Sequence, residues 1–111
     1  MTTPETQVVA SCLRLLRLRG AFAWRNNTGV ARLIGRGGKP RPVRFGAVGS
    51  PDIIGVLRGV PLGVECKSAN GTQSDAQREF EAGFVAAGGV YLLVRSAAEL
   101  SEKLDVVLKS G

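Results

Sequence analysis

Two short apolar runs in the middle of the chain, joined by a turn, constrain its fold more than any other feature. The first run spans residues 52–57, and the second begins at Val60 and ends at Lys67. Arg58-Gly59 lies between them, and runs of this length and composition joined by a glycine-containing pair are typical of a β-hairpin. Pro61 fits this interpretation because proline is tolerated near the start of a strand. The sequence therefore predicts two antiparallel strands at the centre of the fold.

Helical patterns and two further apolar segments surround this hairpin. Apolar residues recur at three- and four-residue steps from about Pro4 to Arg19, and capping-box spacings at Ser74/Gln77 and Ser96/Glu99 open two later helices. Residues 21–25 and 90–94 are strand candidates. The predicted order is α-β-β-β-α-β-α, an α/β sandwich in which helices flank a mixed sheet.

The segment from Arg32 to Arg44 is crowded with glycine, proline and basic residues, which predicts an irregular basic loop. Gly38-Lys39 is followed by Pro40 and lacks the first glycine of a P-loop, so we expect no nucleotide cofactor. The basic side chains of this segment are expected to bind DNA phosphates, with solvated loop charge as the alternative. They are Arg32, Arg36, Lys39, Arg41 and Arg44.

Length and charge indicate one folded domain with a polyanionic partner. The chain has 111 residues, of which 44% are hydrophobic and 22% charged, as expected for a single domain over residues 1–111. Lys and Arg number 15 against 9 Asp and Glu, giving a net charge of +6. This balance favours nucleic acid as a partner, although solubility alone is the simpler explanation.

The chain contains no histidine and only two cysteines, Cys12 and Cys66. Ser-His-Asp and Cys-His catalysis and His-ligated zinc are therefore excluded, and two cysteines are too few for a disulfide framework. Acid, base and metal chemistry falls to carboxylates and lysine. The N-terminus lacks a charged-then-apolar signal pattern, and no apolar run approaches membrane-spanning length, so we expect a cytoplasmic protein without a membrane partner.

Three residues of the predicted hairpin combine into a candidate reaction centre. On a strand, side chains two apart project from the same face, so Glu65 and Lys67 point together while Cys66 points into the core. Asp52 begins the preceding strand, and a two-stranded ribbon can bring its carboxylate beside Glu65. Two carboxylates and an ammonium suit a hard cation such as Mg²⁺ and phosphodiester hydrolysis without histidine. The alternative is a solvated strand face, where alternating opposite charges are common.

Four motifs along the chain together resemble a known family. They are Gly49-Ser50-Pro51-Asp52, Val64-Glu65-Cys66-Lys67, the helix that contains Gln77, and the segment from Gly89 to Arg95. These motifs resemble the VRR-NUC family, a branch of the PD-(D/E)XK nuclease superfamily. The resemblance spans nearly the whole chain, as in a stand-alone single-domain member, and implies a restriction-endonuclease-like core.

The resemblance implies an endonuclease that depends on Mg²⁺ or Mn²⁺. Asp52 and Glu65 are then expected to ligate the metal, with the Cys66 backbone carbonyl as a further ligand. Lys67 is expected to be the catalytic lysine.

The resemblance also implies supporting roles for Glu5, in the metal shell, and for Gln77, at the phosphate or attacking water. Each residue has a structural alternative. Glu5 suits a capping box with Thr2, and Gln77 suits one with Ser74.

Stand-alone relatives in this family resemble Holliday-junction resolvases, which implies a homodimer that cleaves branched DNA. Trp24, beside the apolar Phe22 and Ala23, is assigned to the core or an interface rather than to base stacking. Two alternatives stay open. The chain could be a nucleic-acid-binding module that keeps the fold without turnover, or an interaction subunit whose basic face binds an acidic protein.

Overall fold

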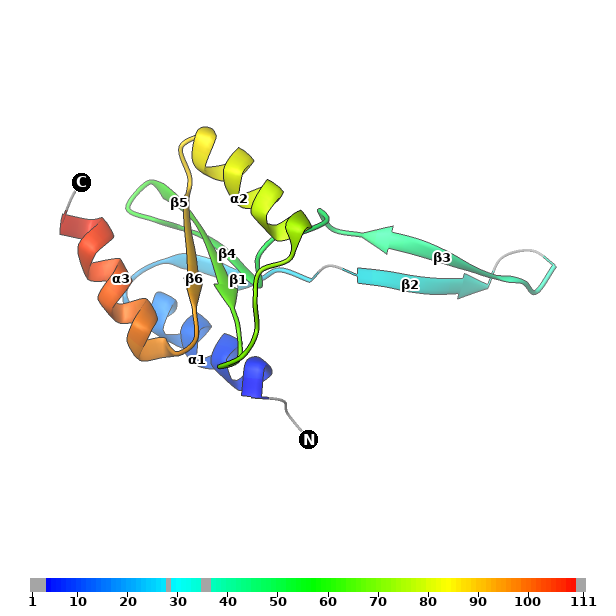
Figure 1. Ribbon diagram of the computed structural model, residues 1–111, viewed down its shortest axis with the longest axis horizontal. Coiled ribbons are helices and arrows are strands. Elements are labelled where there is room, and N and C mark those ends of the chain that lie inside the picture. The colour runs from blue at the N-terminus through cyan, green and yellow to red at the C-terminus, as the bar shows by residue number, and fades with distance from the viewer. Residues whose placement is uncertain (1–3, 28, 35–36, 110–111) are drawn as a thin grey trace.

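The computed structural model describes residues 4–27, 29–34 and 37–109. Its elements follow in the order α1 (Pro4–Leu18), β1 (Phe22–Arg25), β2 (Gly29–Ile34), β3 (Pro40–Phe45), β4 (Ile53–Leu57), β5 (Val60–Cys66), α2 (Asp75–Ala86), β6 (Val90–Val94) and α3 (Ala97–Lys109). Four strands form a mixed sheet in the order β1-β4-β5-β6, while β2 and β3 form a separate two-stranded sheet (Figure 1). The predicted α/β sandwich is therefore confirmed. Within the described residues, no helix has the length and apolar character required to span a membrane.

The central hairpin forms as its sequence predicts. β4 and β5 pair antiparallel with Ile53 opposite Val64. The turn between them places Arg58 and Gly59 at positive φ, 52° and 81°, as a type I′ turn requires. β6 joins β5 in parallel after α2 crosses the sheet, with Leu92 opposite Val64. This pairing places β5 at the centre of the fold, between an antiparallel and a parallel neighbour.

Side chains alternate between the two faces of the sheet, and different helices pack on each face. α1 and α3 pack on one face around a buried core that contains Val9, Cys12, Leu16, Ala23, Ile53, Leu62, Val64, Cys66, Val94, Leu100 and Leu104. On the opposite face, the Phe80 ring of α2 packs against Phe84 and Tyr91, with ring centroids 5.6 and 6.5 Å away. The sheet thus lies between α1 with α3 on one side and α2 on the other (Figure 1).

The segment predicted as an irregular basic loop is instead a two-stranded ribbon, so that prediction is wrong. β2 and β3 pair antiparallel, with Ile34 opposite Pro40 and Gly29 opposite Phe45. This β2–β3 ribbon, with the described residues of its connection, is called the arm below and comprises residues 29–34 and 37–45. It projects from the sheet along the long axis of the molecule, which measures 57 × 35 × 26 Å (Figure 1).

Two prolines explain why the sequence does not indicate strands here. Pro40 and Pro42 are two residues apart, so their nitrogens turn to the same edge of β3, away from β2. In the described part of the chain no other strand pairs with that edge, and the missing N–H groups break no ladder. A two-stranded ribbon therefore accepts prolines that a central strand would reject.

Candidate active site

Asp52 and Glu65 meet at one end of the central hairpin. The β4–β5 register places Ile53 opposite Val64, so Asp52, one residue earlier, lies opposite Glu65, one residue later. Residues directly opposite each other in an antiparallel pair project from the same face. The two carboxyl groups lie close enough for Asp52 to raise the pKa of the Glu65 carboxyl, and Glu65 is only 2% exposed. The structure thus brings together two acids that the sequence separates by a hairpin.

The backbone of β5 also turns toward Asp52. The Cys66 N–H donates to Asp52 Oδ2 over 2.8 Å, whereas the Lys67 N–H donates to the Val94 carbonyl, on the other side of the strand, over 3.0 Å. Because the N–H and C=O of one strand residue point to the same side, the Cys66 carbonyl faces Asp52. It can therefore act as a third oxygen donor, while the Cys66 side chain is fully buried in the core.

The crowding of the two acids changes the protonation of Glu65. Burial, followed by the hydrogen bond and charge of Asp52, raises the pKa of Glu65 to about 8. The Tyr91 hydroxyl donates to Glu65 Oε2 over 3.2 Å and counteracts this rise in part. Burial and the neighbouring Glu65 charge raise the pKa of Tyr91 as well, so its hydroxyl stays a donor. A divalent cation relieves such crowding when it replaces the proton.

Lys67 lies on the same side of β5 as Glu65. Its positive charge lowers the pKa of the Glu65 carboxyl against the larger raising effects, so the ammonium lies within electrostatic reach of that group. The stem of Lys67 packs on the loop that follows it, where a Cβ at Gly71 would lie 3.3 Å from Lys67 Cδ. The loop therefore forms a wall for the lysine side chain.

Arg95 fastens this wall, although the sequence pattern does not single it out as a site residue. Its Nη1 donates to the carbonyls of Ser68 and Gly71 over 2.6 and 2.8 Å. Its backbone N–H donates to Glu99 Oε1 over 2.6 Å. Hydrogen bonds from a guanidinium are stronger than those between neutral groups. Arg95 thus holds the loop against which the Lys67 stem packs.

A cavity of about 430 Å³ opens beside Asp52 and reaches the first turn of α1. Its lining residues are Pro4, Glu5, Thr6, Val9, Arg25, Asp52 and Ser68. Glu5 therefore shares a cavity with Asp52, a juxtaposition that the sequence alone cannot give. Arg25, at the end of β1, adds a guanidinium to the same wall, a group suited to binding a phosphate. Neither Arg25 nor Ser68 carries a sequence signal for this position.

Glu5 and Gln77, the two supporting residues predicted from the resemblance, occupy different settings. Glu5 reaches the cavity, but no three His, Cys, Asp or Glu side chains within the described residues gather as a metal-ligand group. Its capping alternative depends on Thr2, which lies outside those residues. Gln77 Oε1 accepts from the Ser74 N–H over 2.8 Å, and Ser74 Oγ accepts from the Gln77 N–H over 3.2 Å. The predicted capping box at the start of α2 is therefore present.

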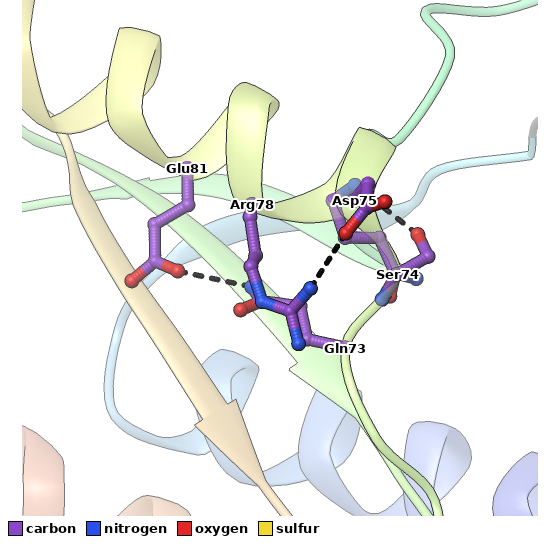
Figure 2. A network of polar contacts seen from close by, with 6 residues as sticks. Gln73, Ser74, Asp75, Arg78 and Glu81 are labelled. Carbon is purple, nitrogen blue, oxygen red and sulfur yellow. Dashed lines mark hydrogen bonds and ion pairs between the residues drawn. The ribbon is translucent and has the colours of Figure 1, made fainter.

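A polar network stabilises the approach to α2, as Figure 2 shows. Gln73 Nε2 donates to Glu81 Oε1 over 2.9 Å, and Arg78 Nη1 lies 2.8 Å from Asp75 Oδ1. The Arg78–Asp75 pair is exposed to solvent and contributes little to stability. The Gln73–Glu81 hydrogen bond connects the loop after Lys67 to α2 and so helps to fix the position of that loop.

Asn26 connects the site to the arm, and it too is missed by sequence reasoning. Its N–H donates to the Asp52 carbonyl over 2.7 Å. Its side-chain amide donates to Ser50 Oγ over 2.7 Å and to the Pro51 carbonyl over 3.0 Å. Ser50 is a buried polar residue, and this bond satisfies its hydroxyl. Asn26 thus fixes the residues that lead into Asp52.

Four of the five basic residues predicted to bind phosphates belong to the arm. The side chains of Lys39 and Arg41 are exposed. The backbones of Arg32 and Arg44 lie in β2 and β3, but their side chains, and the whole of Arg36, lie outside the described residues. Phosphate binding by these residues stays a prediction.

Comparison with known proteins identifies the architecture. No protein-family model and no curated protein matches the chain. A solved structure described as a VRR_NUC domain aligns with 94% of this chain and 97% of its own, with a TM-score of 0.66 and 22% sequence identity. The fold is VRR-NUC-like. At this identity the match establishes the fold alone, and at that level it confirms the resemblance predicted from the motifs. In the VRR-NUC-like fold, the contact between Asp52 and Glu65 lies where β4 begins and β5 ends.

Proposed function

We propose that the chain is an endonuclease that hydrolyses DNA phosphodiester bonds with Mg²⁺ or Mn²⁺. The observation that carries the proposal is the contact between the Asp52 and Glu65 carboxyl groups beside Lys67. The VRR-NUC-like fold supports a nuclease, and the net charge of +6 supports a polyanionic substrate.

The donors at this site suit a hard divalent cation. Asp52, Glu65 and the Cys66 carbonyl would hold it through oxygen atoms, and Mg²⁺ prefers oxygen ligands while it keeps several waters. Glu5 lines the adjoining cavity without joining a ligand group, so we assign it a contact with the cation through water. When bound, the cation supplies Lewis-acid polarisation of the scissile phosphate and lowers the pKa of water.

The side chains around these donors supply position and charge. Lys67 orients the attacking water and offsets the negative charge that develops on the phosphate oxygens. Tyr91 fixes the direction of the Glu65 carboxylate through its hydrogen bond. Arg25 binds a neighbouring phosphate from the cavity wall. The amide Nε2 of Gln77 is the group available for a water or phosphate, because Oε1 serves the capping box.

Cleavage assays with a lysine variant test this function. A labelled four-way junction, a linear duplex and a single strand are incubated with Mg²⁺, with Mn²⁺ and with EDTA. We expect cleavage with either metal, none with EDTA, and a loss of roughly 100- to 1000-fold in Lys67→Ala with DNA binding retained. Lys109→Ala, which removes an exposed lysine at the end of α3, is the matched control and should keep full activity.

The outcomes separate the alternatives. Cleavage that persists in EDTA or in Lys67→Ala would falsify this mechanism. DNA binding without cleavage under any metal would indicate a nucleic-acid-binding module. Absence of both activities, with binding to an acidic protein, would indicate an interaction subunit.

We further propose that two copies act together on branched DNA. One copy offers a single reaction centre, whereas a two-fold pair presents one to each of two strands. Phe22 lies opposite Val56 on one face of the sheet, and the Phe22 and Trp24 rings lie 6.0 Å apart. All three side chains are exposed: Phe22 to 77%, Trp24 to 43% and Val56 to 43%. An exposed apolar patch on an edge strand is a candidate interface, in agreement with the interface alternative predicted for Trp24.

Sedimentation at micromolar protein concentration, with and without junction DNA, tests the pairing. We expect a dimer for the unmodified chain and a monomer for Trp24→Ser. Val85→Ser, which changes an exposed apolar residue on α2, should stay dimeric. An unmodified chain that stays monomeric with junction DNA present rejects the paired sites and leaves the single-site nuclease proposal intact.

A further inference from the structure

The arm lies in a part of the chain with an extreme charge bias. From residue 6 to residue 51 the sequence has nine Arg and Lys residues and no Asp or Glu. The Lys39 and Arg41 side chains of the arm are exposed, as are Pro40 and Pro42 between and beside them. A projecting basic ribbon within such a segment is attracted to a polyanion by many weak interactions at once.

The shape of the arm fits the major groove of B-form DNA. That groove is wide enough to admit an α-helix or a two-stranded antiparallel ribbon. β2 and β3 have six residues each, which corresponds to a length of roughly 20 Å. This length matches about six base pairs at about 3.4 Å per pair. The major groove of A-form RNA is too deep and narrow for such an element.

The prolines argue against a protein partner that extends the ribbon. An added strand would need the backbone N–H groups along the outer edge of β3, and Pro40 and Pro42 remove two of them. Groove binding uses side chains and leaves the edge unpaired, so the prolines do not oppose it. Nucleic acid is therefore the partner that this ribbon fits better.

The chain is anchored on both sides of the arm, at the candidate active site before β2 and at α2 after β3. Before β2, Asn26 donates hydrogen bonds to the Asp52 carbonyl and to Ser50. After β3, Gly49 has a φ of 80° and packs so closely on α2 that a Cβ would overlap the Ala76 carbonyl. A duplex gripped by the arm would consequently lie close to Asp52.

We propose that the arm enters the major groove of a DNA duplex beside the phosphate that the site cleaves, and thereby sets the position of the cut. The part of this inference that concerns the cut rests on the proposed nuclease function. The groove contact itself requires no turnover and is measured separately, in EDTA.

Binding measurements test the contact. Lys39→Gln/Arg41→Gln removes both described charges of the arm. The control pair Arg58→Asn/Lys109→Gln removes the same charge, with Arg58 in the turn at the far end of β4 and Lys109 at the end of α3. For a fluorescent linear duplex in EDTA, we expect the arm variant to bind roughly tenfold more weakly, and the slope of log Kd against log salt concentration to fall by about 2. Equal losses in both variants would reduce the effect to net charge and overturn the proposal.

Dimethyl sulfate footprinting identifies the groove. The reagent methylates guanine N7, which lies in the major groove, and adenine N3, which lies in the minor groove. We expect the unmodified chain to protect guanine N7 and Lys39→Gln/Arg41→Gln to lose that protection. Protection of adenine N3 alone, or guanine protection unchanged in the arm variant, overturns the proposal.

Cleavage mapping then separates the arm from the reaction. With Mg²⁺ and one labelled duplex, we expect the unmodified chain to cut at defined positions and the arm variant to cut at scattered ones. If neither protein cuts while the arm-dependent footprint is present, the nuclease proposal fails and the groove contact stands. If both proteins cut at the same positions with the same footprint, the arm proposal fails and the nuclease proposal stands.

Discussion

Replacing Glu65 by glutamine tests the electrostatics of the site apart from any reaction. In the metal-free protein the pKa of Glu65 is raised from 4.5 to about 8, so the folded chain binds this proton more tightly than the unfolded chain does. The corresponding stability is fully present below pH 4.5 and is lost as the pH rises through about 8. Since a pKa difference of one corresponds to about 1.4 kcal/mol, the loss has a ceiling of about 5 kcal/mol. A loss of even half that size is large for a small domain.

Glu65→Gln removes the charge and keeps both the size of the side chain and an oxygen that can accept from Tyr91. Urea denaturation in EDTA should show that the unmodified chain loses a few kcal/mol of unfolding free energy between about pH 5 and about pH 8, and that the variant loses far less. Near pH 8 the variant should be the more stable protein. Near pH 5 the two should agree within about 1 kcal/mol.

Adding Mg²⁺ supplies the second part of this experiment. At about pH 8 the cation should restore much of the lost stability in the unmodified chain, because it takes the place of the proton between Asp52 and Glu65. The same addition should do little for Glu65→Gln, which lacks one of the two charges. Parallel pH curves for the two proteins would refute the electrostatic reasoning. Equal stabilisation of both by Mg²⁺ would refute the assignment of Glu65 as a ligand.

Three further predictions concern residues that support the site. Gly49→Ala should lose roughly 2–5 kcal/mol of unfolding free energy, because both the positive φ and the contact with α2 oppose a Cβ. Gly59→Ala meets only the positive φ and should lose about 1–2 kcal/mol. Equal losses in urea denaturation would mean that α2 moves to accommodate the Cβ at position 49. Arg95→Gln should slow cleavage roughly 10- to 100-fold at nearly unchanged DNA affinity, because the loop that supports Lys67 loses two hydrogen bonds from the guanidinium. Weaker DNA binding with an unchanged cleavage rate would contradict this positioning role. Ser74→Ala and Gln77→Ala should each lose about 1 kcal/mol through the capping box. A larger cleavage defect in Gln77→Ala than in Ser74→Ala would assign Gln77 a role in the reaction, and equal defects would leave it a helix cap.

The elements that could be predicted from sequence are those whose signals lie in neighbouring residues. α1 begins at Pro4, and α2 begins directly after Ser74, because capping and helical periodicity depend on residues within one or two turns. The β4–β5 hairpin follows from Arg58-Gly59, because that turn type requires positive φ at both positions. The pairing of Asp52 with Glu65 then follows from the register that this turn imposes.

The features that sequence reasoning missed depend on distant contacts. Whether a proline is tolerated in a strand depends on whether that edge has a partner, so Pro40 and Pro42 indicate a loop until the pairing of the arm is known. Asn26 contacts Ser50 across 24 positions, and Arg95 contacts Ser68 across 27. Neither contact has a local pattern that announces it.

The packing that holds the Asp52 and Glu65 carboxyl groups together comes from the opposite face of β5. Val64 and Cys66 flank Glu65 in β5, and both are fully buried in the core formed with α1 and α3. A slip of β5 by one residue would turn these side chains out of the core and drive Glu65 into it, so packing on that face fixes the register. The backbone of Glu65 therefore cannot shift its register relative to Asp52 without loss of the apolar core. The unfavourable free energy of placing the two carboxyl groups together is thus offset by apolar packing of neighbouring residues on the other face of the strand.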